Sequence, residues 1–206
     1  MRTDLREKRR NIILISARAC FKKNGYDKTK MSDVAKAAGL SKGVVYNYFS
    51  DKENLFGEVI KTDSAEQIKY LEDHLPNNAV KGSWSFKDEL DNMLEEIFSS
   101  SSVENLLQAD CLVQAWHSNI IKSILESTLE EYKNALKNFL EAGIRNREID
   151  GNAEALALTI IAVADGLVLQ NLLSPDVSNK QMIMQIKTII SDGIFGRTHR
   201  IEERKQ

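Results

Sequence analysis

Residues 35–56, AKAAGLSKGVVYNYFSDKENLF, form the stretch that decides how the N-terminal part of this chain folds. Its centre, from Gly39 to Gly43, has the G-x-S-x-G spacing of the sharp turn that carries the nucleophile in many serine hydrolases. That turn requires a buried β-strand before its first glycine, because the strand lifts the serine above a parallel sheet. The residues before Gly39 are instead rich in alanine and follow the three- and four-residue spacing of a helix. The context therefore favours a turn between two helices over a hydrolase site.

Helical periodicity continues on both sides of this turn. Apolar spacing predicts helices over residues 5–23, 31–38 and 42–49, and a longer helix that begins near Lys52. Ser41 is expected to cap the helix over 42–49, because its side-chain oxygen can accept a hydrogen bond from an unpaired N–H group of the first turn. Two helices joined by a short turn that contains glycine form a helix-turn-helix unit, whose second helix enters the major groove of DNA.

The outward face of the predicted helix over 42–49 is unusual for a helix in water. The spacing buries Val45 and Phe49 and turns Gly43, Tyr46 and Asn47 outward. A tyrosine hydroxyl can bind phosphate, an asparagine can read base edges, and a glycine lets the backbone approach a ligand closely. A half-buried tyrosine and a solvated asparagine would be the simpler explanation. The combination of side chains nevertheless favours contact with DNA.

The charge distribution agrees with a nucleic-acid partner. The whole chain carries 28 Lys and Arg against 30 Asp and Glu, a net charge of −2. Residues 1–61 hold 14 of these basic residues and 7 of the acidic ones, a net charge of +7, which leaves −9 on residues 62–206. A basic end on an acidic body suggests a surface for phosphates at that end, although a solvated run of charges would give the same count.

The composition predicts an all-α fold. The chain has 206 residues, of which 42% are hydrophobic and only 2 are proline, a composition typical of a globular protein built from long helices. Helical spacing resumes in the C-terminal part over residues 86–98, 103–118, 120–146, 153–173 and 180–195. This length suffices for one large domain or for a small domain joined to a larger one.

The sequence predicts a cytoplasmic protein with no membrane partner. The N-terminal apolar run is too short for a signal peptide. The most apolar segment, residues 153–173, is interrupted by Glu154, Asp165 and Gln170. Cys20 and Cys111 are interpreted as buried free thiols, and no spacing of His or Cys indicates a metal site.

The run from Ile13 to Phe56 resembles the N-terminal domain of the TetR family of bacterial transcriptional regulators. The match holds in unbroken register at Ala17, Phe21, Gly25, Tyr26, Thr29, Val34, Ala35, Ala38, Gly39, Ser41, Gly43, Tyr46, Phe49, Lys52, Glu53 and Leu55. The resemblance implies an N-terminal three-helix helix-turn-helix domain over residues 1–60, followed by a larger helical effector-binding and dimerisation domain over residues 61–206.

The resemblance also implies which residues contact DNA, from the recognition helix and from the starts of its neighbours. The matching positions here are Thr29, Ser32, Ser41, Lys42, Gly43, Tyr46, Asn47, Tyr48 and Lys52. Two positions depart from the family. Lys30 stands where many members have a threonine that can start the second helix, and Ser32 stands where some have an arginine that reads a base.

For the C-terminal part, the resemblance implies a ligand cavity among the central helices and a dimer interface from the last two. Residues 153–173 are the expected interface helix, although an ordinary core helix would also be apolar all round. Their expected partners are Met182, Ile183, Ile186, Ile190 and Ile194. The candidate effector-binding residues are Met93, Gln114, Trp116, His117, Asp165 and Gln170. Any single one of these could equally be a satisfied core residue or a surface position.

Together these observations predict a dimeric transcriptional regulator, in the first place a repressor. It is expected to bind a palindromic operator in double-stranded DNA and to respond to a small-molecule effector, with no catalytic residue, cofactor or metal. Two alternatives from other classes stay open. One is a serine hydrolase that uses Ser41, and the other is a helical interaction module whose basic end binds an acidic protein.

Overall fold

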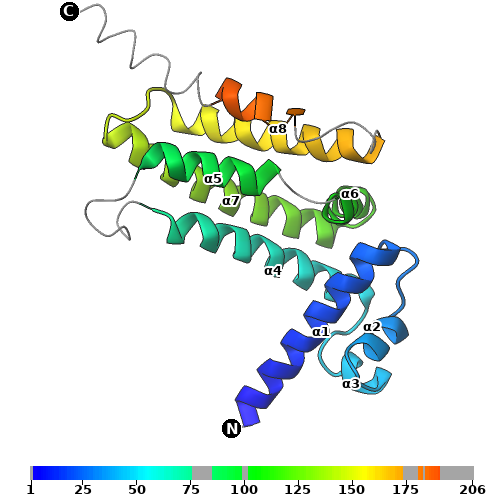
Figure 1. Ribbon diagram of the computed structural model, residues 1–206. Helices are drawn as coiled ribbons and strands as arrows, with labels where there is room; N and C mark the ends of the chain where they lie inside the picture. Colours follow the sequence, from blue (N-terminus) through cyan, green and yellow to red (C-terminus); the bar gives the residue numbers. More distant parts are fainter. Residues whose placement is uncertain (1, 76–84, 99–101, 174–180, 183, 191–206) are drawn as a thin grey trace, which may run out of the picture. The chain divides into compact units, whose positions relative to one another are not determined.

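The computed structural model describes residues 2–75, 85–98, 102–173, 181–182 and 184–190 (Figure 1). Every regular element within these ranges is a helix, and they contain no β-strand. The predicted all-α fold class is confirmed.

The helices follow one another as α1 (Arg2–Asn24), α2 (Met31–Ala37), α3 (Lys42–Tyr46), α4 (Lys52–Asp73), α5 (Phe86–Phe98), α6 (Ser102–His117), α7 (Asn119–Arg145) and α8 (Ala153–Leu173). Residues 181–182 and 184–190 are also helical. α3 is shorter than the predicted helix over 42–49. It ends early because the N–H groups of Asn47 and Tyr48 also bond to the carbonyl oxygens three residues back, those of Val44 and Val45, at 3.1 and 3.0 Å, which tightens the chain into a turn.

The chain forms two compact units. The first unit combines Met1–Ala65 with Val103–Thr128, and the second unit combines Glu66–Ser102 with Leu129–Gln206. α4 and α7 each give their N-terminal part to the first unit and the rest to the second. Residues 103–128 therefore pack with the N-terminal residues, although they lie far from them in sequence.

The core of the first unit is aromatic at its centre. The ring of Phe21 lies edge-on to that of Phe56, with centroids 5.0 Å apart, and the Tyr26 ring lies 4.7 Å from Phe56. Phe21 and Phe56 are fully buried, and full burial of one such ring stabilises the fold by about 1.5–3 kcal/mol. Leu107 and Cys111 of α6 belong to the same core. This core therefore ties α1, α4 and α6 together next to the two short helices.

The second unit is built from α5, α8, the later parts of α4 and α7, and the helical residues after α8. Phe86 of α5 stacks on Phe139 of α7, with ring centroids 5.1 Å apart. The close packing depends on Gly143, because a Cβ there would come within 2.5 Å of the Phe86 ring. A larger residue at position 143 would therefore separate α5 from α7.

α8 is apolar on two opposite sides. Its inner side lies in the core of the second unit and includes Ala153, Ala157, Ile160 and Leu167. On its outer side, Leu158, Leu169 and Leu173 are 51%, 59% and 73% exposed. By length and composition alone the segment Ala153–Gln170 could cross a membrane, with a mean hydropathy of 1.7 and 22% of it buried. A helix that packs against a second protein on its outer side has the same composition.

The apolar residues after α8 fall into two sets. Met182, Ile186 and Ile190, predicted as interface residues, pack against the core of their own unit. Met184 and Ile189 are the exposed apolar residues of this segment. The predicted interface residues Ile183 and Ile194 lie outside the described residues.

Both cysteines are free thiols. Cys111 is buried, and burial raises the pKa of its thiol to about 12. Cys20 is only partly buried, and burial also raises the pKa of its thiol. Among the described residues, no three His, Cys, Asp or Glu side chains gather in a way that could hold a metal ion.

Candidate nucleic-acid interface

The turn between α2 and α3 is built around Gly39. This residue has a φ of +67°, in the left-handed region that glycine adopts without a steric penalty. The N–H of Leu40 donates to the Ala35 carbonyl, with an N···O distance of 2.9 Å, and so closes the C-terminal end of α2. The turn ends one helix and lets the next begin at Lys42.

Ser41 caps α3, as predicted. Its backbone is extended, with φ −75° and ψ 152°, and its hydroxyl oxygen accepts a hydrogen bond from the Val44 N–H at 3.3 Å. The element before Gly39 is α2, not a strand. A serine that caps a helix, with no strand leading into its turn, lacks the geometry of a hydrolase nucleophile.

α3 has one buried and one exposed side. Val45 and Phe49 are 0% and 1% exposed and anchor α3 and the turn after it in the core of the first unit. Tyr46 is 42% exposed, and Asn47 is exposed as well. Tyr48 is partly buried and packs against the core. Of the predicted contact residues from Tyr46 to Tyr48, Tyr46 and Asn47 therefore present their side chains outward.

The start of α3 adds a cation and open backbone to this exposed side. Lys42 and Gly43 are both exposed. The Lys42 ammonium lies 5.6 Å from the centroid of the Tyr46 ring, within the range of a cation–π contact. A Cβ built on Gly43 would meet no atom within 4 Å. The absence of a side chain at Gly43 is thus not required by packing within this chain.

The two predicted contact residues near α2 differ in exposure. Ser32 is exposed at the start of α2. Thr29 is only 1% exposed, and its hydroxyl donates to the carbonyl oxygen of Gly25 at 2.7 Å and lies 3.2 Å from that of Cys20. The Thr29 side chain therefore holds the end of α1 and does not belong to the exposed surface around α3.

Lys52, at the start of α4, is turned toward the protein. Its ammonium donates to the carbonyl oxygens of Tyr26 and Asp27 at 2.8 and 3.3 Å, and it lies 4.1 Å from the centroid of the Tyr26 ring. An ammonium has three N–H donors, so these two bonds leave one for a phosphate oxygen. A DNA contact by Lys52 stays a prediction, and its role within the fold is to hold the connection between α1 and α2.

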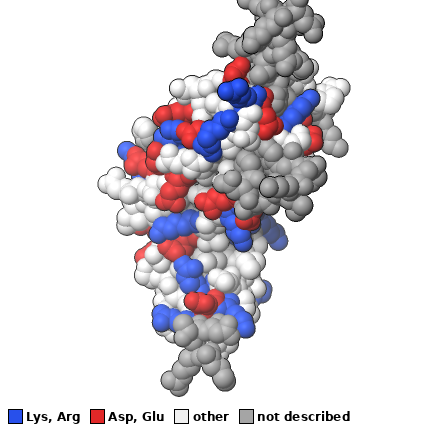
Figure 2. All heavy atoms as spheres, turned by 90° about the vertical axis from the view of Figure 1, so that its left-hand side faces the viewer, with Lys and Arg blue, Asp and Glu red and all other residues white. Residues whose placement is uncertain are grey.

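The segment around α2 and α3 is basic. Residues 28–47 contain four lysines and one acidic residue, a net charge of +3. The lysines are all exposed: Lys28, Lys30, Lys36 and Lys42. Figure 2 shows one face of the molecule, on which basic and acidic side chains are interspersed rather than separated. Lys28 and Lys36 were missed as candidates because they match no motif, whereas the local charge count would have found them.

The missing threonine at the start of α2 is compensated locally. Asp33 accepts a hydrogen bond from the Lys30 N–H at 3.0 Å, which satisfies one of the unpaired donors at this helix end. The N–H of Asp33, which a capping hydroxyl would bind, donates instead to the Lys30 carbonyl oxygen at 2.9 Å, so α2 begins after a lysine without a side-chain cap.

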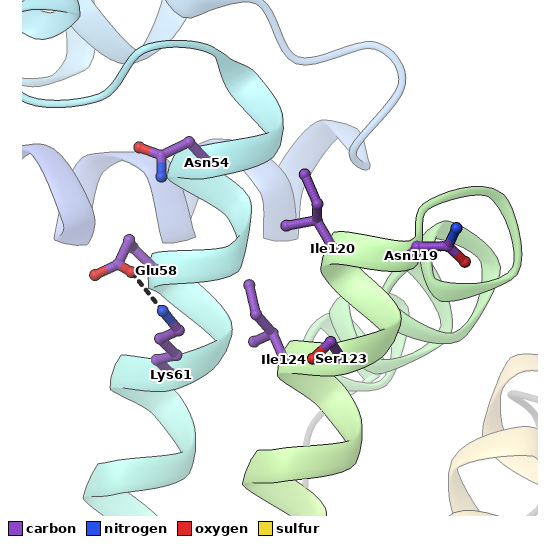
Figure 3. A pocket seen from close by; sticks show the side chains of 7 residues that line it. All are labelled: Asn54, Glu58, Lys61, Asn119, Ile120, Ser123 and Ile124. Carbon is purple, nitrogen blue, oxygen red and sulfur yellow. Dashed lines mark hydrogen bonds and ion pairs between the residues drawn. The ribbon is translucent and has the colours of Figure 1, made fainter.

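An open hollow of about 480 Å³ lies between α4 and the start of α7 in the first unit (Figure 3). Its lining residues are Asn54, Glu58, Lys61, Asn119, Ile120, Ser123 and Ile124. Glu58 accepts a hydrogen bond from Lys61 at 2.9 Å and also pairs with Arg10 of α1. None of the predicted site residues lines this hollow, and its charged groups neutralise one another.

The six candidate effector residues divide between the two units. The first unit contains Gln114, Trp116 and His117 of α6, and the second contains Met93, Asp165 and Gln170. Trp116 is 88% exposed, whereas Met93 is only 2% exposed and lies in the apolar core. An effector site made from these residues stays a prediction.

A tyrosine that sequence reasoning missed lies near one of these candidates. Burial raises the pKa of Tyr132 on α7, and the negative charge of Asp165 on α8 raises it further. Neighbouring atoms also desolvate the Asp165 carboxyl and raise its pKa, although its side chain is exposed by surface area. A single tyrosine within an amphipathic helix carries no signal in the sequence that separates it from ordinary core.

Comparison with known protein families matches both parts of the chain. The family described as "Bacterial regulatory proteins, tetR family" matches residues 13–59, which include α2 and α3. The family described as "BetI-type transcriptional repressor, C-terminal" matches residues 86–194. The N-terminal match covers the predicted DNA-reading helices, and the C-terminal match covers more than half of the chain.

Individual relatives agree with these families. The chain is 31% identical over 144 residues to the transcriptional regulator YfiR of Bacillus subtilis, which covers 69% of each protein. It is 26% identical over 138 residues to the fatty acid metabolism regulator protein of the same species, covering 66% of this chain and 69% of that one. The structure of a transcriptional regulator from Saccharomonospora viridis in complex with choline superposes with a TM-score of 0.75 at 17% identity, covering 91% of this chain and 98% of the other. With two family matches and these relatives, the chain belongs to the TetR family of bacterial regulatory proteins and is a helix-turn-helix transcriptional regulator rather than an enzyme.

Proposed function

We propose that this protein is a cytoplasmic repressor that binds a two-fold symmetric operator as a homodimer and leaves it when a small molecule binds. The observation that carries the proposal is the division of α3 into a side anchored in the core and an exposed side. The exposed side offers Lys42, Gly43, Tyr46 and Asn47, and residues 41–50 contain no carboxylate. Such a surface suits a polyanion into whose groove a short helix can enter.

The exposed residues suit different parts of the DNA. Lys42 supplies a charge for a phosphate, and Gly43 lets the backbone come close to the strand. Asn47 can donate and accept at the edge of an adenine, which gives sequence preference. Phosphate contacts by Lys42 therefore set the affinity, and contacts by Asn47 set the choice of bases.

The proposal of a homodimer is supported by the outer side of α8. Leu158, Ala162, Gly166, Leu169 and Leu173 recur every three or four residues and thus form one exposed apolar stripe. Two such stripes related by a two-fold axis would cover each other, with small residues at the centre that allow close approach. A two-fold dimer presents two copies of α3 to half-sites one helical turn apart, about 34–36 Å on B-DNA.

The proposal of an effector is supported by relatives of this chain. One relative is named for fatty acid metabolism, and one structure of similar fold contains choline. In this chain, Tyr132 and Asp165 are polar groups in largely apolar surroundings, as is usual for a ligand site. We place the effector at these residues. Effector binding would tilt α4 and so change the distance between the two copies of α3 in the dimer. Only one such distance matches the spacing of the DNA grooves.

The salt dependence of DNA binding tests the proposal. A duplex selected by the protein from a random pool is titrated with wild type, Lys42→Ala and, as a control, Lys69→Ala at the exposed Lys69 in the second unit. In a plot of the logarithm of DNA affinity against the logarithm of salt concentration, the slope for Lys42→Ala should be shallower than for wild type by about one per phosphate contact removed, or about two per dimer. Lys69→Ala should keep the wild-type slope. A DNA affinity that does not change with salt would favour the interaction module instead. So would DNA binding that a polyglutamate peptide abolishes when its negative charge equals that of the duplex.

A further inference from the structure

The connection between α1 and α2, residues 25–30, is held by charged side chains from two other helices. It begins with Gly25, whose φ of +79° ends α1, and it leads into α2 at Met31. Because α3 follows α2 after one tight turn, the place of this connection, together with the core packing of Val45 and Phe49, determines where the exposed side of α3 lies.

Asp110 of α6 binds the connection from one side. Its Oδ2 atom accepts the N–H of Tyr26 with an N···O distance of 2.7 Å, although the two residues are 84 positions apart in sequence. The same oxygen would lie 3.4 Å from a Cβ at Gly25, so α6 approaches the backbone closely at the one residue without a side chain. A hydrogen bond to a charged acceptor is roughly twice as strong as one between neutral groups.

Lys52 of α4 binds the same residue from the other side. Its ammonium donates to the Tyr26 carbonyl oxygen at 2.8 Å. Both hydrogen-bonding groups of the Tyr26 backbone are thereby satisfied by side chains of opposite charge from different helices. The Tyr26 ring adds a contact with Phe56 of α4, at 4.7 Å between centroids.

The part of α6 around Asp110 packs into the core of the first unit. Leu107 and Cys111 flank Asp110, are 6% and 8% exposed, and lie in the same core as Phe21 at the end of α1. The Asp110 carboxylate is therefore held on a well-packed part of α6. Its hydrogen bond to Tyr26 fixes the connection relative to α6.

We infer that Asp110 is a positioning residue for DNA binding, whose carboxylate holds the connection between α1 and α2 in the arrangement from which α3 presents its exposed side. The inference rests on the proposed DNA binding for its consequence, but the contact it describes can be measured without DNA. Asp110 lies outside the exposed surface around α3 and is given no contact with DNA itself.

Three variants test the inference. Asp110→Ala removes the acceptor, Asp110→Asn keeps an acceptor oxygen without the charge, and Glu126→Ala removes an exposed carboxylate of the same unit that pairs only weakly with Lys122, at 3.8 Å. For each protein we would measure amide hydrogen exchange over residues 25–30, the midpoint of thermal unfolding, and the affinity for a duplex selected by the wild-type protein from a random pool.

Asp110→Ala should speed exchange of the Tyr26 amide by about tenfold and weaken binding of the selected duplex by about tenfold, as expected for one charge-assisted hydrogen bond. Exchange in the rest of α1 and in α7 should stay at the wild-type rate. Asp110→Asn should fall between Asp110→Ala and wild type, and Glu126→Ala should match wild type in all measurements.

The two readouts separate this inference from the proposed function. Wild-type exchange at Tyr26 in Asp110→Ala, or faster exchange with unchanged DNA affinity, would overturn the positioning role while DNA binding stands. A wild-type protein that selects no duplex would overturn the proposed function, and the exchange rate at Tyr26 would then still decide whether Asp110 holds the connection. A uniform rise in exchange over the whole first unit in both Asp110 variants would mean a merely structural role and would overturn the inference as well.

Discussion

Gly39 and Gly43 lie four residues apart and are needed for different physical reasons. Gly39 has a φ of +67°, so a side chain there strains the backbone although no atom lies within 4 Å of its Cβ position. Gly43 lies within α3 in open space, and no atom of the described residues lies close enough to its Cβ position to require a glycine. The proposed DNA contact would account for Gly43, whereas folding accounts for Gly39.

Alanine at each position should therefore have opposite effects. Gly39→Ala should lower the free energy of unfolding by about 1–2 kcal/mol, because an L-residue resists the left-handed conformation. Gly43→Ala should raise it by up to about 1 kcal/mol, because alanine favours a helix over glycine, and should nevertheless weaken DNA binding. Urea unfolding and a DNA titration measure the two quantities. If Gly43→Ala binds DNA as tightly as wild type, the backbone at Gly43 does not approach the DNA.

The residues that sequence reasoning placed best are those whose partners are local. Ser41 could be recognised as a cap because its partner, the Val44 N–H, lies three residues away. Lys52 could not be placed, since its acceptor, the Tyr26 carbonyl, lies 26 residues away in sequence. Which donor reaches such a carbonyl depends on how the helices pack.

At the scale of single elements, α4 depends on its N-terminal cap. The Asn54 N–H donates to Oδ1 of Asp51 at 2.7 Å, and the Ser50 hydroxyl donates to Oδ2 at 2.8 Å. The bond from the Asn54 backbone is the main cause that lowers the pKa of the Asp51 carboxyl below its ordinary value of 3.8. The charged carboxylate therefore stabilises the folded state above that value, and this stabilisation is lost as the pH falls through the lowered pKa.

Asp51→Asn should thus have an effect that depends on pH. The amide still caps α4, so near neutral pH the variant should lose only about 0.5–1 kcal/mol of unfolding free energy. As the pH is lowered to about 3, the gap between variant and wild type should narrow, since wild type then loses its charge. Urea titrations at several pH values measure this gap. A gap of constant size would show that the charge of Asp51 contributes nothing.

The helices themselves were predictable because their signals are periodic and local, and the all-α class followed from them. The contribution of α6 to the N-terminal unit was not predictable, because Leu107 and Cys111 look like any buried residues of an amphipathic helix. The side of α8 that faces its own core could not be predicted, for a related reason. A helix that is apolar all round has no preferred side in its sequence.

At the scale of the whole molecule, the exposed stripe of α8 should form the homodimer. Leu169→Glu places a charge at a position that is 59% exposed in the single chain and should shift the protein from dimer to monomer in light scattering. Ile15→Glu, at a position that is 70% exposed on α1, serves as the control and should leave the dimer intact. Dimers of Leu169→Glu as stable as those of wild type would show that this stripe is not the interface.

The most direct test of the central claim is to let the protein and its Asn47→Ala variant each select duplexes from the same random pool. If α3 reads bases through its exposed side, wild type should enrich one motif with two-fold related halves. Asn47→Ala should lose the preference at one base pair, most simply an adenine, at the equivalent place in both halves. An unchanged motif for Asn47→Ala, or no enrichment by wild type, would contradict the account.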